Sequence, residues 1–156
     1  MPAASGAAAG PMPPDLHWAV VLILSWITCG LAGLIWTFRQ ASFVKKINPA
    51  SKAVLLLVVS LLAMVAQVVV YIAAFSAGSF SGVQAAVGII LLLNIVILIA
   101  ALAAIFGMRR SLVNYYNTVE PMGLRLSGAM TFFFNVLYFQ YHLSRIARWK
   151  KTGQLS

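Results

Sequence analysis

Residues 83–108 read VQAAVGIILLLNIVILIAALAAIFGM and carry no charged side chain. A helix of this length is about 39 Å long at about 1.5 Å per residue, which exceeds the roughly 30 Å hydrocarbon core of a bilayer. Residues 53–77, AVLLLVVSLLAMVAQVVVYIAAFSA, are also free of charge, and the short uncharged segment GSFSG separates the two runs. This pattern predicts a hairpin of two transmembrane helices.

A third apolar run occupies residues 16–38, LHWAVVLILSWITCGLAGLIWTF. Trp18 and Trp36 stand near its two ends, where aromatic side chains favour the membrane interface. We therefore expect a third spanning helix. The basic residues 39–52 that follow are expected to form a loop, with Asn48 as the N-cap of the next helix and Pro49 at its first position.

The composition supports a membrane protein. Of 156 residues, 62% are hydrophobic and 8% are charged, whereas soluble domains are about 45–50% apolar and about 25% charged. The fold class predicted is an all-α integral membrane protein with one helical membrane domain, residues 16–156. Residues 1–15, rich in Ala, Pro and Gly, are expected to form a disordered N-terminal tail.

The scarcity of carboxylates argues against several chemistries. Asp15 and Glu120 are the two acidic residues, and both stand at segment edges, which argues against a paired-carboxylate catalytic site. A hard-cation site needs more oxygen ligands than these two side chains readily supply. Cys29 is the single cysteine, so it has no partner for an intrachain disulfide. We expect no enzymatic activity, cofactor or metal. The cations flank apolar runs, which favours anionic lipid head groups over nucleic acid as their partners.

The C-terminal third is mixed in character. Residues 109–126 are expected to form a short interfacial helix and a turn. A helix is predicted over 127–149, but its apolar core, 129–139, is only 11 residues long and contains Thr131 and Asn135. We expect an amphipathic interfacial or re-entrant helix; the alternative is a fourth transmembrane helix. Its polar stripe consists of Ser127, Thr131, Asn135, Tyr138, His142, Arg145 and Trp149.

The distribution of Lys and Arg predicts a topology. No cation precedes the first apolar run, four follow it, three lie in 109–125, and four lie in the C-terminal segment. Cations favour cytoplasmic loops. With three spans, the N-terminus is expected outside and the C-terminus in the cytoplasm. The residues expected to contact lipid head groups are Lys45, Lys46, Arg109, Arg110, Arg145, Arg148, Lys150 and Lys151.

Two sets of residues are candidates for helix packing. Gln67 and Asn94 stand at nearly equal distances from the 78–82 turn, so their amides are expected to meet across the hairpin. The alternative is a polar lining for a solute path. Ser25, Cys29 and Gly33 recur every four residues and predict a packing face of small residues, with Cys29 reduced and buried against another helix.

Two tracts resemble small bacterial inner-membrane proteins of unknown function. VLILSWITCGLAGLIW followed by FVKKINPASKA resembles their apolar run ending in Thr-x-Gly and Trp and followed by a basic loop; the matching positions are Thr28, Gly30, Trp36, Lys45, Lys46, Ser51 and Lys52. NYYNTVEPMGLRLSG and FFFNVLYFQYHL resemble the closing half of such proteins. The resemblance covers residues 16–53 and 114–146, implies the bacterial cytoplasmic membrane as location, and implies no activity.

The function predicted from these features is that of a non-enzymatic accessory or scaffold subunit. Helix packing and basic cytoplasmic segments would mediate it, with the lipid bilayer and a second copy or another membrane protein as partners. The alternative is a subunit of an oligomeric channel or transporter, lined at the level of Gln67 and Asn94.

Overall fold

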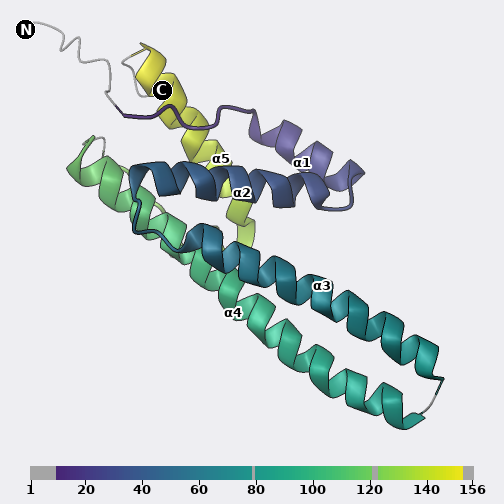
Figure 1. Ribbon diagram of the computed structural model, residues 1–156. Helices are drawn as coiled ribbons and strands as arrows, with labels where there is room; N and C mark the ends of the chain where they lie inside the picture. Colours follow the sequence, from purple (N-terminus) through teal and green to yellow (C-terminus); the bar gives the residue numbers. More distant parts are fainter. Residues whose placement is uncertain (1–9, 79, 121–122, 153–156) are drawn as a thin grey trace, which may run out of the picture. The chain divides into compact units, whose positions relative to one another are not determined.

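The structure is a computed structural model that describes residues 10–78, 80–120 and 123–152, and within these ranges it holds five α-helices and no strand (Figure 1). The predicted all-helical class is confirmed. The chain divides into two compact units. We call Lys52–Ala104 the hairpin unit, and the described residues of Met1–Ser51 and Ile105–Ser156 the polar unit.

The hairpin unit consists of α3 (Ala53–Ala77) and the first part of α4 (Phe80–Thr118), which run side by side (Figure 1). The bounds of α3 agree with the sequence prediction, and Gly78 ends it in the left-handed conformation (φ 59°). Both helices are long and apolar enough to span a membrane, yet only 17% of the most apolar stretch of each is buried. Their apolar surface therefore faces outward.

Helix α4 is longer than the sequence analysis predicts. It continues past Arg109 and Arg110 to Thr118, so the interfacial helix expected after residue 108 is the end of α4 itself. Residues 109–118 contain neither Gly nor Pro, and nothing in their backbone preferences stops the helix. From Ile105 onward α4 belongs to the polar unit.

The prediction of a third spanning helix over 16–38 is wrong. The run divides into α1 (Trp18–Ile27) and α2 (Leu31–Ile47), which reverse direction between them (Figure 1). Cys29 (φ 50°) and Gly30 (φ 94°) make the turn in left-handed conformations. The 10 residues of α1 span about 15 Å, half of what a bilayer core requires.

The turn forms because its residues cap both helices. The Thr28 hydroxyl donates to the Leu24 carbonyl at the end of α1 and accepts from the Ala32 amide at the start of α2. Gly30 adopts a backbone conformation that costs other residues energy. Apolar composition on both sides of the turn is compatible with one long helix, which is why hydropathy alone missed it.

Helix α2 also extends through the segment predicted to be a basic loop. It ends at Ile47, and Asn48 follows it as a C-cap rather than as the expected N-cap of the next helix. The Asn48 side chain donates a 3.0 Å hydrogen bond to the Ser111 hydroxyl on the last part of α4. Arg39, Lys45 and Lys46 of this segment therefore lie on a helix, while Lys52 precedes α3.

Helix α5 (Gly128–Thr152) forms at the predicted place but is bent at Asn135, where φ is 32° and ψ is −104°. Its second half packs against α1 and α2 and buries Phe139, Gln140, Leu143 and Ile146. Thr131, a member of the predicted polar stripe, is fully buried. Helix α5 is a core element of the polar unit.

Candidate functional site

The Gln140 side chain is the centre of a buried hydrogen-bond network in the polar unit. Its Oε1 accepts from Trp36 Nε1 at 2.7 Å and from Gln40 Nε2 at 3.3 Å, both on α2. Its Nε2 donates to the carbonyls of Leu16 (2.6 Å) and Pro14 (3.2 Å). One amide with no solvent exposure thus joins α2, α5 and the segment before α1.

Neighbouring side chains extend this network. Ser144 donates to the Leu16 carbonyl at 3.1 Å, and Gln40 Nε2 donates to the Val136 carbonyl at 3.1 Å. Val136 is the residue that directly follows the bend at Asn135. Buried polar groups need such partners, because an unpaired one costs about 1–3 kcal/mol.

Glu120 and Lys150 form a buried ion pair at 3.0 Å, with side chains only 9% and 2% exposed. Tyr115 donates to the same carboxylate at 3.2 Å, and Lys150 also donates to the Pro11 carbonyl at 3.2 Å. A Cβ added at Gly10 would collide with Glu120 and Tyr115, so glycine permits the N-terminal segment to lie against the pair.

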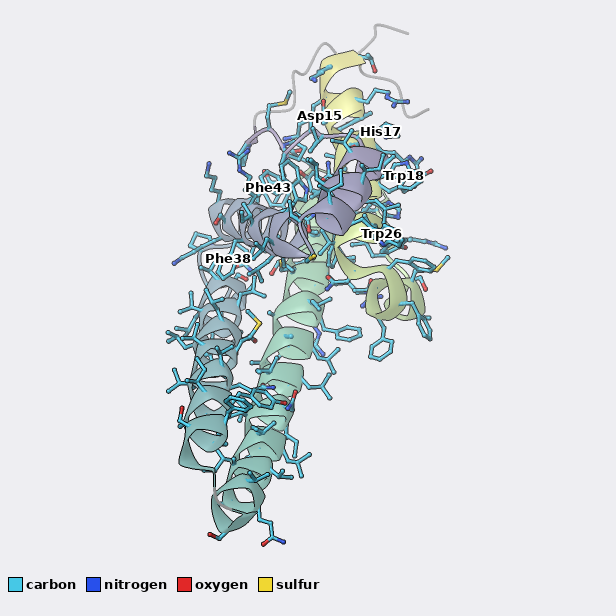
Figure 2. All side chains as sticks on the ribbon, turned by 90° about the vertical axis from the view of Figure 1, so that its right-hand side faces the viewer. Asp15, His17, Trp18, Trp26, Phe38 and Phe43 are labelled. Atoms are coloured by element: carbon cyan, nitrogen blue, oxygen red, sulfur yellow. The ribbon has the colours of Figure 1, made fainter. Side chains whose placement is uncertain are left out.

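The second carboxylate is paired as well. Asp15 Oδ2 lies 2.7 Å from Lys151 Nζ in an exposed ion pair at the end of α5. Figure 2 labels Asp15 beside His17, the residue whose Nδ1 accepts from the Ala19 amide and caps α1. Pro11, Pro14 and Asp15 of the predicted N-terminal tail thus contact α5. Residues 1–9 of that tail lie outside the described residues.

The cations expected to contact lipid head groups fall into two groups. The first group makes contacts within the chain. The Lys150 side chain is buried against Glu120, and Lys151 is paired with Asp15. Arg109 is half-buried and donates from Nε and Nη2 to the Leu126 carbonyl. Arg145 is half-buried, with its guanidinium 5.9 Å from the Tyr141 ring centre. The exposed ones are Lys45, Lys46, Arg110 and Arg148.

The predicted bond between Gln67 and Asn94 is not formed, although both residues are described. Asn94 is exposed, and its amide donates to the Ile90 carbonyl of its own helix at 2.8 Å. Gln67 is half-buried. Instead, Ser60 on α3 approaches the Ile97 carbonyl on α4 at 3.5 Å. The polar contact between α3 and α4 is thus made by the Ser60 hydroxyl, about two helical turns from Gln67, and not by the two amides.

The row of small residues also packs differently from the prediction. Ser25 and Gly33 face each other across the α1–α2 turn, where a Cβ on Gly33 would lie 2.8 Å from Ser25 Oγ. Cys29 lies in the turn and is exposed, so its expected burial against another helix is wrong within this chain. The break at residues 28–30 places the members of the row on different helices.

The described titratable side chains of the polar unit include no metal-binding cluster and one histidine with a shifted pKa. Across the described ranges, no three His, Cys, Asp or Glu side chains gather where a metal ion could bind. Burial lowers the pKa of His142, and the neighbouring Arg145 charge lowers it further. The His142 ring contacts Tyr138 and Tyr141 edge-on, at centre distances of 4.7 and 5.3 Å.

Gln140, Gln40 and the Glu120–Lys150 pair were not predicted as functional groups from the sequence. The pair had a usable signal: with two carboxylates in the chain, any buried lysine must pair with one of them. No sequence signal of comparable strength singled out Gln140, because a lone amide among aromatic residues occurs both at a membrane interface and in a protein core. Comparisons with protein families, with curated proteins and with solved structures give no match to this chain.

Proposed function

We propose that this chain is a non-enzymatic integral membrane protein that serves as an accessory or scaffold subunit. The observation that carries the proposal is the exposure of the hairpin unit, where only 17% of each apolar stretch is buried. A core helix of a soluble protein would be mostly covered by its own chain. Lipid, together with helices of a partner, is the cover that suits this surface.

We further propose that α3 and α4 are the spanning helices and that both flanking segments lie in the cytoplasm. Two spans return the chain to the side from which it entered. The Asp15–Lys151 and Gln140–Leu16 contacts support this topology, because neither can form across a bilayer. All 11 cations then lie on the cytoplasmic side of the membrane, in accord with the preference of cations for the cytoplasm, and the GSFSG turn lies on the opposite side.

This topology keeps the cytoplasmic C-terminus predicted from the sequence and replaces the external N-terminus. The reason is the break at Gly30, which removes one span and with it one crossing. The location proposed is the bacterial cytoplasmic membrane, on the resemblance of the first apolar run and its basic exit to small proteins of that membrane.

Asn94 is the residue we propose for contact with a partner in the membrane. It is exposed on an otherwise apolar stretch, and its amide oxygen retains the capacity to accept a hydrogen bond. Within hydrocarbon, such a group favours a polar group of a neighbouring helix. Ser76 is a matched control, since it is exposed and likewise donates to a carbonyl one turn back in its own helix.

The test is the mass of the full chain extracted from its native membrane in a mild detergent. We expect a particle that contains a different protein in a fixed ratio. Asn94→Leu should dissociate it and Ser76→Ala should not. A closed ring of identical copies that conducts ions would favour the channel alternative. A particle of the single chain alone, unaltered by Asn94→Leu, would contradict the scaffold proposal.

A further inference from the structure

An open pocket of about 540 Å³ lies between the N-terminal segment and α2. Met12 and Pro14 line one side of it. Phe38, Arg39, Ser42 and Lys46 on α2 line the other. Positions 39, 42 and 46 follow helical steps of three and four, which place their side chains along one face of α2. The pocket is therefore lined by two cations, a hydroxyl and apolar side chains that include Phe38 and Phe43, both labelled in Figure 2.

Within the part of the chain that the structure describes, neither cation of this pocket is in an ion pair with a carboxylate. Asp15 is bound to Lys151 and Glu120 to Lys150, which accounts for both acidic residues. The guanidinium of Arg39 stacks on the Trp36 ring at 5.8 Å from its centre, a contact that orients it without neutralising it. An anion from outside the chain would complete the site.

A second pocket, of about 230 Å³, adjoins the first and shares Ile35 and Arg39 with it. Its other lining residues come from α1, α2 and the segment before α1, and all of them present apolar surface: Leu16, Val21, Leu24, Ala32 and Trp36. Arg39 thus stands at the junction of a basic pocket and an apolar one. A basic pocket next to an apolar pocket suits a molecule that has a phosphate at one end and an alkyl chain at the other.

We propose that the adjoining pockets bind one anionic phospholipid. Its phosphate would be held by Arg39, Lys46 and the Ser42 hydroxyl, and part of an acyl chain would lie along Ile35 into the apolar pocket. Arginine and lysine donors suit phosphate oxygens. The apolar pocket beside Arg39 favours a lipid over a free phosphate compound. This inference rests on the membrane location proposed above and adds a defined lipid site to it.

The experiment uses the purified full chain in a neutral detergent and native mass spectrometry. Phosphatidylglycerol, phosphatidylcholine and inorganic phosphate are titrated separately, and bound adducts are counted. The test variant is Arg39→Gln with Lys46→Gln. The charge-matched control is Lys52→Gln with Arg125→Gln, whose positions are exposed and do not line either pocket.

We expect one tightly retained phosphatidylglycerol per chain. The affinity for phosphatidylglycerol should be roughly thirtyfold lower in the test variant, because each cation near an anionic head group contributes roughly a fivefold gain in affinity. The control should change the affinity less than threefold. Ala32→Phe, which fills the apolar pocket, should weaken phosphatidylglycerol but leave inorganic phosphate unaffected.

Three results would overturn the inference. Equal losses in the test and control variants would mean attraction to overall charge. Equal retention of phosphatidylcholine would mean that the cations do not select the head group. Inorganic phosphate bound as tightly as phosphatidylglycerol would mean that the ligand is a free phosphate compound.

Membrane insertion is measured in parallel by resistance of each variant to alkaline extraction. If the variants stay inserted but bind lipid like the unmodified chain, the lipid site is wrong and the proposed function stands. If the unmodified chain is itself extracted by alkali, the proposed membrane function fails first, and the inference that rests on it fails with it.

Discussion

The hairpin unit and the polar unit are built by opposite means. The hairpin unit contains one charged residue, Lys52. A polar side chain joins its two helices at Ser60, which lies 3.5 Å from the Ile97 carbonyl. The polar unit contains the other ten cations and both carboxylates. It buries an ion pair and a glutamine that joins three segments.

This difference indicates where each unit derives its stability. In the hairpin unit apolar surface is turned outward, so that removing a single polar side chain disturbs little. In the polar unit a few polar side chains are buried, and each leaves unpaired partners when it is removed. Matched substitutions in the two units should therefore have very different effects.

The largest effect is expected at Lys150. Lys150→Met leaves Glu120 buried without its cation and should lower the free energy of unfolding of the polar unit by about 3–5 kcal/mol. Urea titration in mild detergent, followed by tryptophan fluorescence, measures it. Lys151→Met, at the exposed pair, should cost less than about 1 kcal/mol. Similar costs for the two variants would contradict the burial of Lys150.

Gln140 compares directly with Gln67. Gln140→Leu leaves the Trp36 ring N–H and the Leu16 carbonyl without their partner and should cost about 2–4 kcal/mol. Gln67→Leu, on a half-buried face of α3, should change stability by less than about 1 kcal/mol. The same urea titration measures both variants. If Gln67→Leu lowered the free energy of unfolding more than Gln140→Leu, the claim that buried polar side chains stabilise the polar unit and not the hairpin unit would be wrong.

The glycines give a smaller contrast of opposite sign. Gly30→Ala should destabilise the α1–α2 turn by about 1–2 kcal/mol, because φ is 94° there and alanine disfavours it, although no atom would obstruct the new methyl group. Gly88→Ala, in the open interior of α4, should stabilise by about 0.5–1 kcal/mol. Thermal unfolding of both variants checks this. Stabilisation by Gly30→Ala would mean that the run forms one continuous helix.

The smallest effect concerns pH. The pKa of His142 is lowered in the fold by burial and then by Arg145, so the unfolded chain binds the proton more readily. Stability should fall as the pH drops below about 6.5. His142→Gln should remove this part of the pH dependence, as measured by melting temperatures between pH 5 and 8. If the melting temperature of the variant changed with pH as that of the unmodified chain does, the pH dependence would belong to another titratable group.

The sequence was sufficient for the hairpin unit because its fold follows from uninterrupted apolar composition. The bounds of α3 were predicted correctly, whereas α4 begins three residues before the predicted residue 83 and ends ten residues after the predicted residue 108. Hydropathy averaged over a window reports only whether a stretch is apolar. It therefore could not separate one spanning helix at 16–38 from α1 and α2, which depend on Thr28 and Gly30.

The polar unit was largely beyond sequence reasoning for a second reason. Its buried groups come from segments more than 100 positions apart, as in the bond between Gln140 and Trp36. No periodicity within α5 distinguishes Gln140, which is buried, from His142, which is half-buried. The polar stripe predicted for this helix assumed a straight axis, and the bend at Asn135 changes the face on which the later residues lie.

The central claim is that two helices span the membrane and that the polar unit lies on one cytoplasmic side. Single cysteines at Met12, Ser81 and Arg125, in a Cys29→Ala background, test it most directly with a membrane-impermeant maleimide on intact cells. We predict that the cysteine at Ser81 is labelled from outside, while those at Met12 and Arg125 are labelled only after permeabilisation. Labelling at Met12 in intact cells would contradict the account, because the N-terminal segment would then lie on the opposite side of the membrane from α5.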